Sequence, residues 1–201
     1  MTSQGRVIGI VGSYRKQGIV DSAVSEILRA AEQQGVETKK IYLLDRHIEF
    51  CTNCRTCMQE PGEARGKCVL EDDLEGLLTE IEQADYLVIG APVNFSNVNA
   101  LTRRFMERCV GFAWWPWESP APKIRKRTRN KRAVLVSASG APAWMSRYFT
   151  GTLGALKKMA TLFGAKPVGV LWVGLVNREH MELPQKSSLK ARVLGRKLVA
   201  N

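Results

Sequence analysis

The chain has 201 residues, of which 45% are hydrophobic and 24% are charged, and this composition excludes a disordered or fibrous protein. A chain of this length buries a sizeable core, so we expect a single domain over residues 1–201. No apolar run reaches the ~20 residues of a membrane span, and no signal segment precedes the first apolar strand, so we expect a cytoplasmic protein with no membrane partner.

Apolar segments that suit buried strands alternate along the chain with segments of helical periodicity. The expected strands are 7–11, 36–44, 86–89, 133–136 and 168–176, and the expected helices are 19–34, 74–83, 98–109, 149–163 and 183–199. Asp72 and Glu75 resemble a capping box at the start of the second helix. Because parallel strands need crossover helices, the alternation predicts an α/β, doubly wound, five-stranded parallel sheet with helices on both faces. In the flavodoxin-like strand order 2-1-3-4-5, ligands bind beside the first and third strands.

A polar loop with the sequence Gly12-Ser13-Tyr14-Arg15-Lys16-Gln17-Gly18 joins the first strand to its helix. Backbone N–H groups and the positive helix end converge at such a loop and favour an anion there. The glycine pattern of dinucleotide sites and the lysine pattern of phosphate-loop NTPases are both missing, so a monophosphate ligand fits better. Seen alone, the loop is also compatible with an ordinary polar connection.

A second segment, after the third strand, reads Ala91-Pro92-Val93-Asn94-Phe95-Ser96-Asn97-Val98-Asn99-Ala100 and is followed by Arg103, Arg104, Phe105, Glu107 and Arg108. Together the two segments resemble the NAD(P)H-dependent FMN reductase family, whose members have the flavodoxin-like fold. The resemblance implies an FMN-dependent oxidoreductase that passes electrons from NAD(P)H to a quinone, a free flavin or a similar small acceptor, as a homodimer or higher homo-oligomer. It implies no catalytic residue, because the cofactor carries the chemistry.

The resemblance also implies which residues bind FMN. These are Ser13, Arg15, Gln17, Gly18, Ile19 and Val20 at the phosphate, Pro92, Val93, Asn94, Phe95, Ser96 and Asn97 along the isoalloxazine, and Ser139 and Gly140 on its far side. The chain departs from the family pattern at Ile19 and Val20, where Asn and Thr are frequent, and at Asn94, where an aromatic residue is common. We therefore expect phosphate contacts that rely on the backbone and a weaker affinity for FMN.

Cys51, Cys54 and Cys57 are spaced three residues apart, and Cys68 follows after a longer gap. Such spacing allows several thiolates to face one iron–sulfur centre. It resembles the motif of iron–sulfur flavoproteins, which exchange electrons between a [4Fe–4S] cluster and FMN, so an electron carrier with a cluster on this loop is the alternative function. Zinc or reduced, redox-active thiols remain open, and we assign no metal ligands. Cys109 lies on an apolar helix stripe and is expected in the core.

The net charge is +11, and many of the cations lie in residues 123–132. A basic loop next to Trp114, Trp115 and Trp117 is compatible with nucleic-acid binding. Prolines interrupt the tryptophans, however, so we expect these rings to pack against the protein. We expect the charge to attract anionic ligands such as flavin phosphate and NADPH, and we expect no nucleic-acid partner.

Overall fold

The computed structural model describes residues 5–125 and 130–200. Residues 126–129 of the basic segment lie outside this description. The elements follow one another along the chain as β1 (Arg6–Val11), α1 (Ile19–Glu32), β2 (Glu37–Tyr42), η1 (Leu43–Asp45), η2 (Thr56–Met58), α2 (Leu74–Gln83), β3 (Tyr86–Asn94), β4 (Asn97–Val98), α3 (Ala100–Arg108), η3 (Cys109–Phe112), β5 (Ala113–Trp114), β6 (Lys123–Ile124), β7 (Lys131–Ala138), α4 (Ala143–Phe149), α5 (Thr152–Leu162), β8 (Ala165–Val173) and α6 (Gln185–Val199). None of the described helices is long and apolar enough to cross a membrane.

A central sheet with the strand order β2-β1-β3-β7-β8 organises the fold, and all its neighbouring strands are parallel. The short strand β4 adds an antiparallel hairpin to the end of β3. The order corresponds to 2-1-3-4-5 when only the long strands are numbered, so the predicted flavodoxin-like fold is confirmed. The chain passes from β1 to β2 on one side and then crosses back to β3 on the other side of β1, so the strand order reverses between β1 and β3. Ligands of such sheets bind at the carboxyl ends of the strands beside this reversal.

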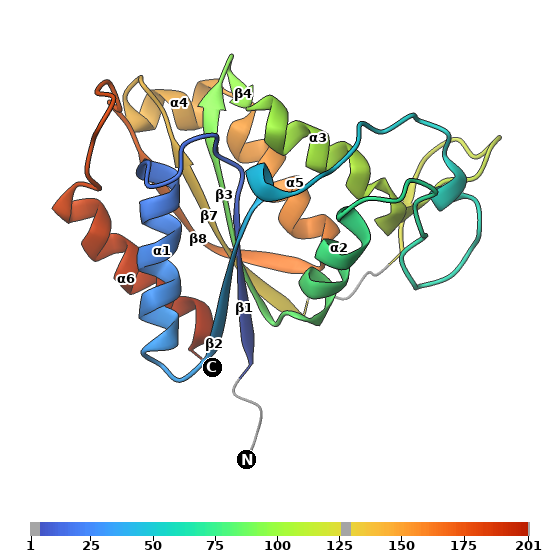
Figure 1. Ribbon diagram of the computed structural model, residues 1–201, viewed down its shortest axis with the longest axis horizontal. Coiled ribbons are helices and arrows are strands. Elements are labelled where there is room, and N and C mark those ends of the chain that lie inside the picture. The colour runs from blue at the N-terminus through green and yellow to red at the C-terminus, as the bar shows by residue number, and fades with distance from the viewer. Residues whose placement is uncertain (1–4, 126–129, 201) are drawn as a thin grey trace.

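Helices cover both faces of the sheet (Figure 1). α1 and α6 pack against the face that carries Val7 and Val11, while α2, α3 and α5 cover the face that carries Ile8 and Ile10. Side chains of successive strand residues point to opposite faces, so the continuous apolar run in β1 supplies both cores. Two apolar layers thus fix the positions of the loops at the carboxyl ends of the strands.

Three sequence predictions about individual elements were wrong. β3 does not close at Gly90 but continues to Asn94, because its pairing with β7 extends to the register pair Pro92 and Ala138. The predicted helix 149–163 begins later, as α5 at Thr152, and a separate helix that the sequence pattern did not indicate, α4, precedes it and ends at Phe149, with an extended Thr150 between the two. The Gly151 amide between them donates a hydrogen bond to the Ser96 carbonyl at 2.9 Å, which ties this junction to the β3–β4 hairpin.

The predicted capping box at the start of α2 was the third error. Asp73 occupies the N-cap position, and no side chain caps it. The Asp72 carboxylate does accept a hydrogen bond from the Leu74 amide at 3.0 Å, but it also binds the Arg108 guanidinium. Glu75 pairs with Arg65 rather than reaching back to the helix start. Asp72 and Glu75 therefore form ion pairs with arginines elsewhere in the chain instead of the capping box that the local pattern predicted.

Candidate functional site

A cavity of about 380 Å³ lies beyond the carboxyl ends of the central strands. The loop after β1, the end of β3, the loop after β7 and the segment after β8 all contribute to its wall. The sequence-predicted residues that line it are Ser13, Arg15, Gly18, Ile19, Val20, Pro92, Val93, Asn94, Ser139 and Gly140. The volume falls within the ~300–1,000 Å³ that is usual for small-molecule sites.

The loop after β1 presents polar groups to this cavity. The Ser13 hydroxyl accepts a hydrogen bond from the Arg15 amide at 3.1 Å and so folds the loop back on itself. α1 begins at Ile19, and no side chain caps its N-cap residue Gly18. The side chains of Ile19 and Val20 are buried in the core beneath α1, so these two residues offer only backbone N–H groups. The helix terminus thus keeps the donors and partial positive charge that suit an anion.

A close approach of α3 holds the same loop from the other side. A Cβ atom at Gly12 would lie 2.1 Å from the Thr102 hydroxyl oxygen, so only glycine fits there without movement. The Thr102 hydroxyl donates to the Asn99 side-chain oxygen at 2.6 Å, and its oxygen also lies 3.1 Å from the Gly12 carbonyl oxygen. The Tyr14 hydroxyl accepts from the Leu101 amide at 3.1 Å. The start of α3 and the loop therefore form one hydrogen-bonded unit.

The other predicted residues lie outside the cavity wall. Gln17 does not line the cavity, and its backbone amide donates a hydrogen bond to the Asp21 carboxylate. Phe95 and Ser96 form the turn of the β3–β4 hairpin with φ angles of 45° and 60°, and the Phe95 side chain is fully exposed. Asn97 packs against Gly151 and accepts a hydrogen bond from the Val98 amide. Their roles in binding FMN stay predictions.

Sequence reasoning missed several residues of the cavity wall. These are Tyr14, Ala138, Val176, Arg178, Glu179 and Met181. The last four follow β8, which ends at Val173. Because the sequence pattern extended this strand to residue 176, the loop at its carboxyl end was overlooked. The rule that ligands lie at the carboxyl ends of parallel strands would have pointed to it.

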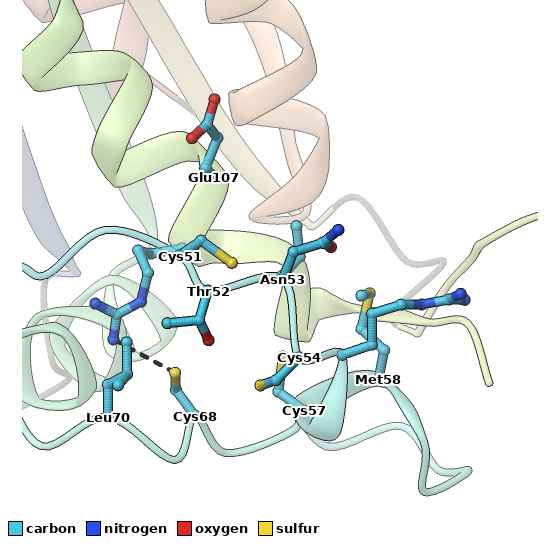
Figure 2. Close-up of a pocket in the computed structure, with 12 residues that line it drawn as sticks. Cys51, Thr52, Asn53, Cys54, Cys57, Met58, Cys68, Leu70 and Glu107 are labelled. Carbon is cyan, nitrogen blue, oxygen red and sulfur yellow. Dashed lines mark hydrogen bonds between the residues drawn. The ribbon is translucent and has the colours of Figure 1, made fainter. Parts of the chain in front are cut away.

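A second cavity, of about 210 Å³, lies in the long loop between η1 and α2. Cys51, Cys54, Cys57 and Cys68 all line it together with Arg108. Figure 2 shows these four cysteines around a common space, beside the end of α3. Within residues 5–125 and 130–200, however, no three His, Cys, Asp or Glu side chains are placed to hold a metal ion.

The surroundings shift the pKa values of two of these loop thiols, Cys57 and Cys54. Burial raises the pKa of the Cys57 thiol, and the negative charge of Cys68, Cys51 and Cys54 raises it further. A hydrogen bond from the Thr56 hydroxyl lowers the pKa of the exposed Cys54 thiol. Burial also raises the pKa of Cys109, which lies in the core as predicted and takes no part in this cavity. The loop cysteines thus form one group.

A buried ion pair lies beside the cysteine cavity, whose wall includes Arg108. The side chains of Asp72 and Arg108 are each 1% exposed, and an Arg108 Nη1 to Asp72 Oδ2 contact of 2.6 Å joins them. Burial raises the pKa of Asp72, but the Arg108 bond and the amides of Glu49 and Leu74 outweigh it and lower the pKa overall. Arg108 Nη2 also donates to Cys68 Sγ at 3.4 Å. The pair therefore fixes Cys68 against α3.

The basic and tryptophan segment supports the cysteine loop from outside. The Arg55 guanidinium lies 4.2 Å from the ring centroids of both Trp115 and Trp117 and donates to the Trp115 carbonyl at 2.6 Å. Arg125 donates to the Cys57 and Gly111 carbonyls. The Trp115 ring therefore packs against Arg55, as expected, whereas the Trp117 ring remains 59% exposed.

The fold is flavodoxin-like, and the first cavity lies at the carboxyl edge of its parallel sheet, where ligands of this fold bind. A model of the family described as NADPH-dependent FMN reductase matches residues 6–173, and the chain belongs to this family. FMN is the cofactor of this family, and NAD(P)H is its electron donor.

Curated relatives include iron–sulfur flavoproteins. One from Archaeoglobus fulgidus is 28% identical over 164 residues, which cover 82% of this chain and 66% of the relative. Another, from Methanocaldococcus jannaschii, is 37% identical over 136 residues, which cover 67% of this chain and 63% of the relative. Across these and further relatives the chain spans about half to two thirds of their length.

Solved structures share the fold at low sequence identity. An NAD(P)H:quinone oxidoreductase from Methanothermobacter marburgensis has a TM-score of 0.72 and 16% identity, and the match covers 96% of this chain and 98% of that one. An FMN-dependent NADH-azoreductase from Bacillus anthracis, in complex with FMN, has a TM-score of 0.67 and 13% identity, with 97% and 99% covered. At such identities the likeness supports the fold.

Proposed function

We propose that the chain is a single-domain, FMN-dependent oxidoreductase that takes electrons from NAD(P)H and passes them to a quinone, a free flavin or a similar small acceptor. One observation carries this proposal: the two loops singled out by family resemblance meet Ser139 and Gly140 around one cavity of about 380 Å³. Membership of the reductase family supports the same activity. The cavity is open enough for a second molecule to reach a bound flavin, since Asn94 and Gly140 on its wall are exposed.

Each part of the cavity has a distinct task in this proposal. When bound, FMN supplies the hydride and electron transfer chemistry. The uncapped start of α1, the Ser13 hydroxyl and the Arg15 guanidinium hold the phosphate through charge-assisted hydrogen bonds. Pro92, Val93 and Asn94 at the end of β3 position the isoalloxazine. Two hydrogen bonds fix the position of Ser139 on the cavity wall. Its hydroxyl accepts from Trp172 Nε1 at 3.0 Å and donates to the Ala141 carbonyl at 3.0 Å.

Titration of flavin-free protein with FMN tests the proposed phosphate site. Loss of a hydrogen bond to a charged group costs about 1.5–3 kcal/mol, so Arg15→Ala should weaken FMN binding by roughly ten- to a hundredfold. Arg29→Ala is the matched control, because Arg29 is an exposed cation in the last turn of the same helix. Equal affinities for the two variants would contradict the site. Protein that oxidises neither NADPH nor NADH with any acceptor would contradict the activity.

We also propose that the protein forms a homo-oligomer through an aromatic surface beside the cavity. We define this surface as Phe95 on the hairpin and Trp144, Tyr148 and Phe149 on α4, all of them largely exposed. The Gly151 to Ser96 hydrogen bond brings the hairpin next to the end of α4. Contiguous apolar patches of this kind are uncommon on monomers. Light scattering should show an oligomer that Tyr148→Glu dissociates, and a monomeric wild-type protein would contradict the proposal.

A second candidate function, an iron–sulfur flavoprotein electron carrier, is favoured by the convergence of Cys51, Cys54, Cys57 and Cys68 on one cavity. These residues fit the group, because thiolates are the usual ligands of [4Fe–4S] clusters. Zinc needs four ligands at ~2.0–2.3 Å from one ion, and the described side chains are not gathered that closely. A cluster takes each of its thiolate ligands on a separate iron. The relatives named iron–sulfur flavoproteins support this candidate.

Iron and acid-labile sulfide in protein purified without oxygen test this second function. We expect both, with an iron-dependent absorbance in addition to the flavin spectrum. Cys54→Ser should lower the iron content, whereas Cys109→Ala should not, because Cys109 is buried in the core and does not line the cavity. A pure flavin spectrum without iron would reduce the loop cysteines to thiols and would leave the simple reductase.

A further inference from the structure

A buried carboxylate lies directly behind the loop that we propose for the FMN phosphate. Asp21 is the third residue of α1 and is only 3% exposed. Its Oδ2 atom accepts a hydrogen bond from the backbone amide of Gln17 at 2.6 Å. A negative charge at this position would repel a phosphate group. A buried carboxylate at this position is therefore compatible with a phosphate site only if a nearby cation balances its negative charge.

Three side chains from α1 and β2 surround the Asp21 carboxylate. Lys40 Nζ lies 2.8 Å from Asp21 Oδ1 and 2.8 Å from the Ser25 hydroxyl oxygen. The Tyr42 hydroxyl lies 3.1 Å from both carboxylate oxygens. Burial raises the pKa of Asp21, but the bonds from Lys40, Gln17 and Tyr42 outweigh it and lower the pKa overall, so both members of the ion pair are charged.

The contact with Gln17 gives Asp21 a role in the shape of the loop. Gln17 has a φ angle of 62°, in the left-handed region that non-glycine residues seldom adopt. The bond from its amide to Asp21 stabilises this conformation. The chain then passes through Gly18 into α1, and Gly18, Ile19 and Val20 line the cavity. Asp21 therefore helps to decide which residues of the loop face the ligand.

We propose that Asp21 and Lys40 are a charge-balanced positioning pair for the phosphate loop: Asp21 fixes the backbone at Gln17, and Lys40 cancels the charge that would otherwise repel the phosphate. The pair thereby contributes to the preference for FMN over riboflavin, which lacks the phosphate. This inference rests on the proposed FMN site. It concerns residues that do not line the cavity and act on the ligand through the loop.

Dissociation constants for FMN and riboflavin, measured by quenching of flavin fluorescence at mildly alkaline pH, test the pair. Lys40→Met leaves the Asp21 charge uncompensated and should reduce the preference for FMN by about tenfold. Asp21→Asn keeps a side-chain oxygen that can accept from the Gln17 backbone amide, leaves the Lys40 charge uncompensated and should increase the preference. The double variant should return toward the wild-type value. Lys39→Met is the matched control, because Lys39 lies on the same strand but pairs with Glu80 instead.

The direction of the two effects separates charge from stability. If Asp21→Asn and Lys40→Met lower the preference for FMN equally, or if Lys40→Met acts no differently from Lys39→Met, the inference is overturned. A variant that unfolds, as judged by its thermal melt, is replaced by the double variant, whose preference must then match the wild type. If wild-type protein binds neither flavin, the proposed function itself fails. If it binds both equally, only the role of the phosphate loop and its supporting pair is lost.

Discussion

The buried pair of Asp72 and Arg108 offers a quantitative prediction about the cysteine loop. Arg108→Met would leave the Asp72 carboxylate buried without its partner, since both side chains are 1% exposed. Removal of one member of a buried ion pair costs about 3–5 kcal/mol. For a domain of this size each kcal/mol corresponds to roughly 2–4 °C in Tm, so the expected loss is about 6–20 °C.

Thermal unfolding followed by circular dichroism measures this loss. Arg103→Met is the matched control, because Arg103 is exposed on the same helix, and its effect should stay within about 0.5 kcal/mol. An Arg108→Met protein that is as stable as the Arg103→Met protein would refute the reasoning.

The remaining predictions concern the two loops and the response to acid. Gly12→Ala should lower both FMN affinity and stability, because the added methyl group would meet the Thr102 hydroxyl at 2.1 Å; unchanged FMN binding in a titration would contradict the packing argument. Arg55→Ala should expose the cysteine loop to limited proteolysis, because it removes the contacts to two tryptophan rings; an unchanged cleavage rate would show that those contacts do not hold the loop. The pKa values of Asp21 and Asp72 are lowered in the folded protein, so their contribution to stability is present above the unfolded value of ~3.9 and is lost as pH falls through the folded values. Urea unfolding should therefore show little change between neutral pH and about pH 5 from these groups and a decline below about pH 4; Asp72→Asn should flatten that decline.

Local patterns predicted the fold and the two loops at the carboxyl edge, while the family resemblance supplied the individual wall residues, including Ser139 and Gly140. The apolar run from Val7 to Val11 and the Gly12 to Gly18 loop are contiguous in sequence, and parallel pairing brings the loop beside Pro92 at the carboxyl edge. Such features depend on periodicity and on the positions of strand ends. They could therefore be found without any knowledge of distant contacts.

The supporting contacts could not be predicted, because they join residues far apart in the chain. Arg108 and Asp72 are separated by 36 residues, and Arg55 and Trp115 by 60. A helix pattern assigned Asp72 to a cap, and nothing in the local sequence indicated the competing guanidinium. Arg178 was missed for a different reason, since the extended reading of the last strand hid the loop in which it lies.

Anaerobic addition of an equimolar amount of NADPH, and separately NADH, to the FMN-loaded protein tests the central claim most directly. We expect at least one of the two donors to bleach the absorbance of oxidised flavin, and we expect a quinone or free flavin then to restore it. Flavin absorbance that persists with both donors would contradict an FMN-dependent NAD(P)H oxidoreductase.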